Sequence, residues 1–94
     1  MGINIHITFK ISGMKDDFLL FWVGCYYTKR VSDLTSIFLS MSGLISSEII
    51  KYVYNSKILN ENLTTEEASL KDNSGIVVYV KNPLNLFLFK VSFN

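Results

Sequence analysis

The chain has 94 residues, a formal net charge of +1 and a single cysteine. This length predicts one domain with a modest core. A near-neutral charge without a basic stripe argues against nucleic acid or an acidic membrane surface as a partner. One cysteine excludes an intramolecular disulfide, and no signal-peptide pattern opens the chain, so we expect a cytoplasmic protein.

The first part of the chain predicts two strands joined as a hairpin. Isoleucine and phenylalanine alternate with polar residues from residue 3 to residue 11, which is typical of a strand with one buried face. A polar turn follows over residues 12–17, and an apolar second strand is predicted over residues 18–27. The apolar runs at 18–27 and 84–89 fall short of the roughly 18 residues that indicate a membrane-spanning helix.

A helix is predicted after the hairpin, because apolar residues recur at helical spacing from residue 31 to residue 41. Gly43 is placed to end this helix in the left-handed conformation, and a connector follows over residues 44–48. The apolar positions of the helix are Val31, Leu34, Ile37, Phe38 and Met41.

The second half of the chain predicts two further strands. A short strand over 52–54 leads into a polar turn at 55–57, an apolar hook at 58–59 and the start of a short helix at 64–67. Leu70 is expected to fill the core, and a turn at 73–75 precedes a closing β-branched strand over 76–80. The predicted class is therefore α+β, with a mixed sheet of four or five strands packed on one helix.

Residues 1–83 are expected to form this single domain, since Pro83 cannot continue a strand ladder. Residues 84–94 form an apolar tail in which phenylalanine and valine partly alternate with other residues. The tail could add an edge strand, fold over the sheet, or pair with a second copy of the chain.

Residues 53–80 resemble the corresponding run of ubiquitin and SUMO without a gap. The resemblance implies a β-grasp fold and a non-enzymatic role in binding other proteins. It puts Val53 and Tyr79 where ubiquitin carries two members of its apolar recognition patch. It also puts five residues at core positions of those families: Tyr54, Leu59, Leu70, Ile76 and Val78.

The first half is more similar to autophagy-related protein 12, a ubiquitin-like autophagy modifier. The matching positions are Lys10 and Gly13, Val31 to Leu34, then Leu44, Ser47 and Glu48, and finally Val53 to Asn55. That family ends in a Trp-Gly pair used for conjugation, whereas the last glycine here is Gly75. The resemblance therefore implies non-covalent binding to an autophagy-related 5 partner.

The candidate binding residues come from strands that are apolar on both faces. Phe21, Val23 and Cys25 are expected to point into the core, which turns the intervening residues outward. The predicted patch on the outer face of the sheet consists of Leu20, Trp22, Val53, Val77 and Tyr79. The alternative is that the tail at 84–94 covers this face within the monomer.

No catalytic, metal or cofactor site is predicted. Cys25 is expected to be a small buried apolar residue, and His6 has no second histidine with which to bind a metal. No acid, base and nucleophile combine into a constellation, so an enzyme is the least favoured class. Besides the autophagy-type binder, two alternatives stay open: an adaptor that presents Val53 and Tyr79 to other proteins, and a self-associating structural subunit.

Overall fold

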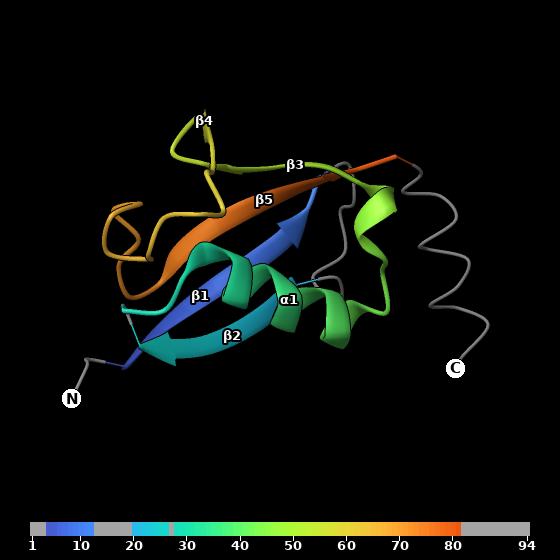
Figure 1. Ribbon diagram of the computed structural model, residues 1–94. Helices are drawn as coiled ribbons and strands as arrows, with labels where there is room; N and C mark the ends of the chain where they lie inside the picture. The colour runs from blue at the N-terminus through green and yellow to red at the C-terminus, as the bar shows by residue number, and fades with distance from the viewer. Residues whose placement is uncertain (1–3, 13–19, 27, 82–94) are drawn as a thin grey trace.

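The computed structural model describes residues 4–12, 20–26 and 28–81 (Figure 1). The predicted turn at the hairpin tip, Tyr27 and the tail at 84–94 lie outside the described residues. Within the described part, no helix is long and apolar enough to cross a bilayer. The elements are β1 (Asn4–Ile11), β2 (Leu20–Tyr26), α1 (Val31–Ser42), a 3-10 helix (Ser46–Glu48), β3 (Ile49–Tyr54), β4 (Lys57–Ile58) and β5 (Ser74–Val80).

The five strands form one mixed sheet in the order β2-β1-β5-β3-β4. β1 pairs antiparallel with β2 and parallel with β5, and β3 pairs antiparallel with both β5 and β4. α1 crosses one face of this sheet (Figure 1). This arrangement confirms the predicted α+β, β-grasp architecture, including the N-terminal hairpin.

The core lies between α1 and the sheet face turned toward it. Phe9 and Phe38 are fully buried, with ring centroids 4.8 Å apart in a stacked arrangement, and Phe21 meets Phe38 edge-on at 5.4 Å. Alternate residues of β1 and β5 complete this face, as the period-2 pattern predicted. The other fully buried side chains on these two strands are Ile7, Ile11, Ile76 and Val78.

The helix α1 ends as predicted but is covered less than predicted. Gly43 adopts φ 78°, and its N–H donates to the carbonyl of Leu39 at 3.0 Å. However, Ile37 and Met41 are 41% and 49% exposed. They flank the buried stripe centred on Phe38, on the side where the sheet ends at the edge strand β2. Among the described residues, no further strand lies there to cover them.

The segment from β3 to Leu59 differs from its prediction in where the strand begins and in how deeply two residues are buried. The strand begins at Ile49, three residues earlier than expected, and Tyr52 is buried. Tyr54 and Leu59, which were expected in the core, are only partly buried against it. The reason for Tyr54 is its hydroxyl, which donates to the Ser69 carbonyl and accepts from the Ser74 hydroxyl near the surface.

The short helix predicted at 64–67 is a single turn. Thr64 N–H donates to Glu67 Oε1 at 2.9 Å and Glu67 N–H donates to Thr64 Oγ1 at 3.1 Å, which is the capping-box pattern of a helix start. Ser69 then takes φ 63°, and Leu70 N–H reaches back to the Thr65 carbonyl at 3.0 Å. A helix-ending motif thus follows the helix start directly, so no regular helix forms. Leu70 is buried, as predicted.

Candidate protein-binding face

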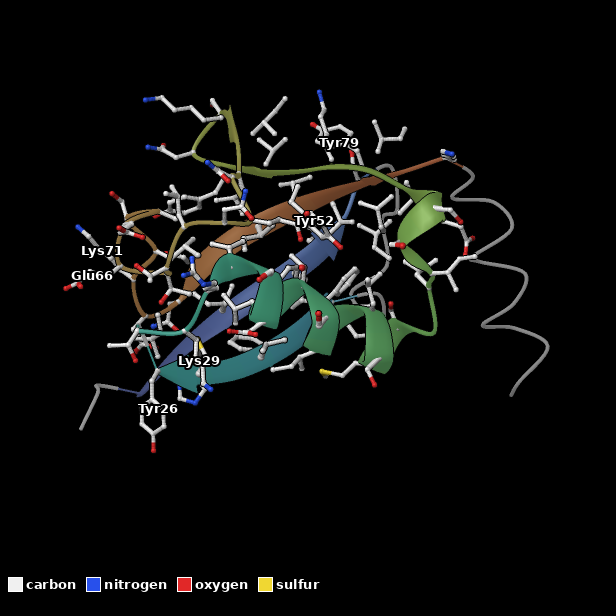
Figure 2. All side chains as sticks on the ribbon, viewed as in Figure 1. Tyr26, Lys29, Tyr52, Glu66, Lys71 and Tyr79 are labelled. Atoms are coloured by element: carbon white, nitrogen blue, oxygen red, sulfur yellow. The ribbon has the colours of Figure 1, made fainter. Side chains whose placement is uncertain are left out.

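The sheet face turned away from α1 carries all five residues of the predicted patch. The side chains before and after each of them along the strand, where described, lie on the inner face, and all are buried except Tyr54, which is partly buried. Figure 2 shows the difference for two tyrosines: Tyr52 lies on the side of the sheet toward α1, and Tyr79 lies on the opposite side. The sequence therefore located the outward side chains of these strands correctly.

Cross-strand pairing arranges this face in rows. One row crosses all five strands, because Lys10 pairs with Leu20 and with Val77, and Val53 pairs with Val77 and with Ile58. The next row toward the start of β1 joins Trp22, Thr8 and Gly75. A third row joins Tyr79 and Lys51.

The predicted patch is divided in two. Leu20 and Trp22 belong to β2, whereas Val53, Val77 and Tyr79 belong to β3 and β5. β1 lies between these strands and contributes Thr8 and Lys10, so polar side chains separate the two apolar groups. The sequence contained the signal for this division, because Lys10 occupies an outward position of the alternating first strand.

The two groups differ in exposure. Trp22 is 56% exposed, whereas Leu20, Val53, Val77 and Tyr79 are half-buried by their neighbours. Lys51 Nζ lies 4.9 Å from the ring centroid of Tyr79 and shields part of that ring through a cation–π contact. Trp22 is therefore the most accessible aromatic anchor of the predicted patch.

Sequence reasoning missed Ile58 as a member of this face. It was interpreted as part of an apolar hook, but it pairs directly with Val53 and is 69% exposed. Directly paired residues project to the same face of a sheet, so Ile58 extends the β3–β5 group to the edge strand β4. Its place after a tight polar turn was the available signal, since Asn55 and Ser56 adopt positive φ and close a hairpin.

The charge on this face is positive. Lys10 and Lys51 are exposed there, and no described outward position of the five strands carries a carboxylate. Just before β5, Asp72 accepts from His6 N–H at 2.8 Å and contacts His6 Nδ1 at 3.3 Å. The hydrogen bond from the His6 backbone lowers the pKa of Asp72, so it stays ionised and paired with His6.

Cys25 and His6 form no reactive site with their described neighbours. Cys25 is half-buried beside a groove of about 570 Å³ between β2 and α1, and burial raises the pKa of its thiol. A protonated thiol is a poor nucleophile and a poor metal ligand. Among the described residues, no group of three histidine, cysteine, aspartate or glutamate side chains could hold a metal ion.

Sequence comparisons give no relatives for this chain. No protein-family model matches it, and no curated protein matches it.

Solved structures share its fold. One of them is "Caldiarchaeum Subterraneum Ubiquitin", with a TM-score of 0.73 and 13% identity over 83% of this chain and 94% of that one. The ubiquitin-like domain of an Arabidopsis thaliana protein has a TM-score of 0.68 and 23% identity over 83% and 78%. The UBL domain of Plasmodium falciparum Dsk2 has a TM-score of 0.69 and 19% identity over 84% and 100%. At these identities the likeness establishes the fold alone, and the fold is ubiquitin-like.

Proposed function

We propose that this chain, which has the ubiquitin-like fold, is a non-enzymatic recognition domain that binds a protein partner through the outer face of its sheet. The observation that carries the proposal is the exposure of Trp22, 56%, on a face that also holds four half-buried apolar side chains. A strand face turned to solvent ordinarily carries polar residues. Apolar side chains grouped on such a face are typical of a protein interface.

The chemistry of the face suits protein recognition. Tryptophan and tyrosine supply large contact areas and are enriched among the residues that contribute most to binding free energy. Trp22 and Tyr79 lie on β2 and β5, on either side of β1, so a partner that contacts both must cover Lys10 as well. This requirement favours a partner with acidic groups between its apolar contacts.

Two identities for the partner are proposed. The motif resemblance at Lys10, at Val31–Leu34 and at Val53–Asn55 supports an autophagy-related 12-like factor that binds an autophagy-related 5 partner non-covalently. The outward positions of Val53 and Tyr79 support an adaptor that presents this surface to degradation or trafficking machinery. Both proposals place the same face at the interface, and they differ in the protein that would be recovered.

The test compares native and denaturing purification of N-terminally tagged protein from its own cells. A partner that is recovered natively and lost on denaturation supports non-covalent recognition, and its identity chooses between the two proposals. The variant Trp22→Ser combined with Tyr79→Ser should abolish recovery of that partner. Met41→Ser, an exposed apolar residue on α1, is the matched control and should leave recovery unchanged. Undiminished recovery with the double variant would refute this face as the interface.

A further inference from the structure

The side-chain layer of the outer face is interrupted at Gly75. This residue lies within β5, between Ser74, which is buried on the inner face, and Ile76, which is also buried. A Cβ atom built at Gly75 would have no atom within 4 Å apart from those of Gly75 and its two chain neighbours. The backbone of β5 is therefore open to the outside at this point, and a side chain from another molecule can approach it closely.

The surroundings of this open position combine a threonine, an apolar side chain and a cation. Thr8 pairs with both Gly75 and Trp22, so the indole lies two strands away in the same row. Val77 follows two residues later on β5 and pairs with Lys10. Residues two apart on a strand lie about 7 Å from each other on the same face. The position above Gly75 is thus bordered by Thr8, Val77 and Lys10, and Trp22 lies one strand beyond Thr8.

We propose that the open position above Gly75 receives an apolar side chain of the partner protein, while Lys10 pairs with a carboxylate of the same partner segment. This inference rests on the proposed function and names the chemistry of the partner. An extended segment with an acidic residue two positions from an apolar one has the required spacing of about 7 Å. The indole of Trp22, one strand beyond Thr8, offers a further apolar contact to the same partner segment.

The lysines of the outer face favour an acidic segment over a second copy of the chain as the occupant. A second copy that docked face to face would bring Lys10 and Lys51 of one molecule against the lysines of the other, and like charges oppose such contact. A segment with carboxylates next to its apolar residue meets complementary charge. The partner is therefore an acidic segment of a different protein.

Gly75 offers a variant that tests the proposal without threatening the fold. In Gly75→Val the new side chain meets no neighbour at its Cβ, and valine suits a strand better than glycine. The folded state should therefore be kept or slightly stabilised, while the open position is filled. Lys10→Glu reverses the charge, and Lys29→Glu is its matched control, because Lys29 is exposed beside the groove between β2 and α1.

The experiment is a titration of the ¹⁵N-labelled full chain, followed by NMR, with two synthetic peptides. One peptide carries a central leucine with aspartates two positions to either side, and the other carries lysines in place of the aspartates. The acidic peptide should shift the amide signals of Gly75 and Thr8 and the indole N–H of Trp22. We expect Gly75→Val and Lys10→Glu each to weaken its binding by about tenfold. Lys29→Glu should leave binding unchanged.

Several outcomes would overturn the inference. Shifts confined to Val53 and Tyr79, with no effect of Gly75→Val, would reject the insertion above Gly75 and leave the proposed function intact. Equal binding of both peptides would reject the pairing with Lys10. Absence of outer-face shifts with either peptide would reject the inference as well, and the purification test with Trp22→Ser and Tyr79→Ser then decides the proposed function separately.

Discussion

The two faces of one sheet differ sharply in this protein, although the same strands build both. On the inner face, Phe9 and Ile76 are fully buried against Phe38 of α1. On the outer face, Trp22 is 56% exposed and Gly75 leaves the backbone open. Because burial of apolar area is the main source of folding stability, the inner face should hold the fold together. The outer face is then available for recognition, since changes there cost little stability.

The largest predicted difference between the faces involves two aromatic residues. Phe38→Ala removes a ring that stacks on Phe9 at 4.8 Å, and we expect a loss of about 3–5 kcal/mol in the free energy of unfolding. Trp22→Ser should cost about 1 kcal/mol or less. Urea titration of both variants measures the difference. A Trp22 variant as costly as Phe38→Ala would mean that the outer face is covered in the folded chain, as the alternative with the tail requires.

Two neighbouring residues of β5 lie on opposite faces of the sheet. Ile76 is fully buried on the inner face, so Ile76→Ala should cost about 2–5 kcal/mol. Val77 is half-buried on the outer face, and Val77→Ala should cost about 1 kcal/mol. The two residues share one strand and one backbone environment, so the ratio of the two losses, measured by urea titration, isolates the effect of the face. Equal losses would contradict the assignment of Ile76 to the inner face and Val77 to the outer face.

A tyrosine of the inner face should make stability fall at alkaline pH. Burial, followed by the negative charge of Glu61, raises the pKa of Tyr52 from its ordinary 10 to about 12. Between these values the unfolded chain releases the phenol proton and the folded chain keeps it, so wild-type stability decreases as pH rises from 10 to 12. Tyr52→Phe should remove this contribution and leave the dependence below pH 10 unchanged. Urea midpoints from pH 8 to 12 test this, and parallel curves would refute it.

The smallest effect concerns the outer face itself. Lys51→Gln removes the cation over the ring of Tyr79, and we expect a loss of about 0.5–1 kcal/mol that shrinks in high salt. Lys57→Gln is the matched control, because Lys57 is an exposed lysine with no contact to Tyr79 in the described structure. Thermal unfolding at low and high salt provides the measurement. A loss that matched that of a core variant would show that the outer face is part of the stabilising structure.

Several features could be predicted from the sequence because they depend on local periodicity. The alternation in β1 indicated which side chains point inward, and Gly43 indicated where α1 ends. The spacing in α1, however, did not show that Ile37 and Met41 would stay exposed. Their burial depends on whether a strand lies opposite them, and among the described strands the sheet ends at β2. The prediction of a short helix at 64–67 was wrong for a different reason. The helix start at Thr64 is a local pattern, but the left-handed conformation of Ser69, which ends the turn, is not visible in that pattern.

The sequence by itself determined the β-grasp order of elements and the side of each strand on which Leu20, Trp22, Val53, Val77 and Tyr79 lie, because a strand has a period of two residues. Only the tertiary structure decided how these residues are grouped. The order β2-β1-β5-β3-β4 inserts Lys10 between Leu20 and Val77 and brings Ile58 beside Val53. Such neighbours come from different strands, and their proximity depends on the register of pairing between distant segments, which no local pattern specifies.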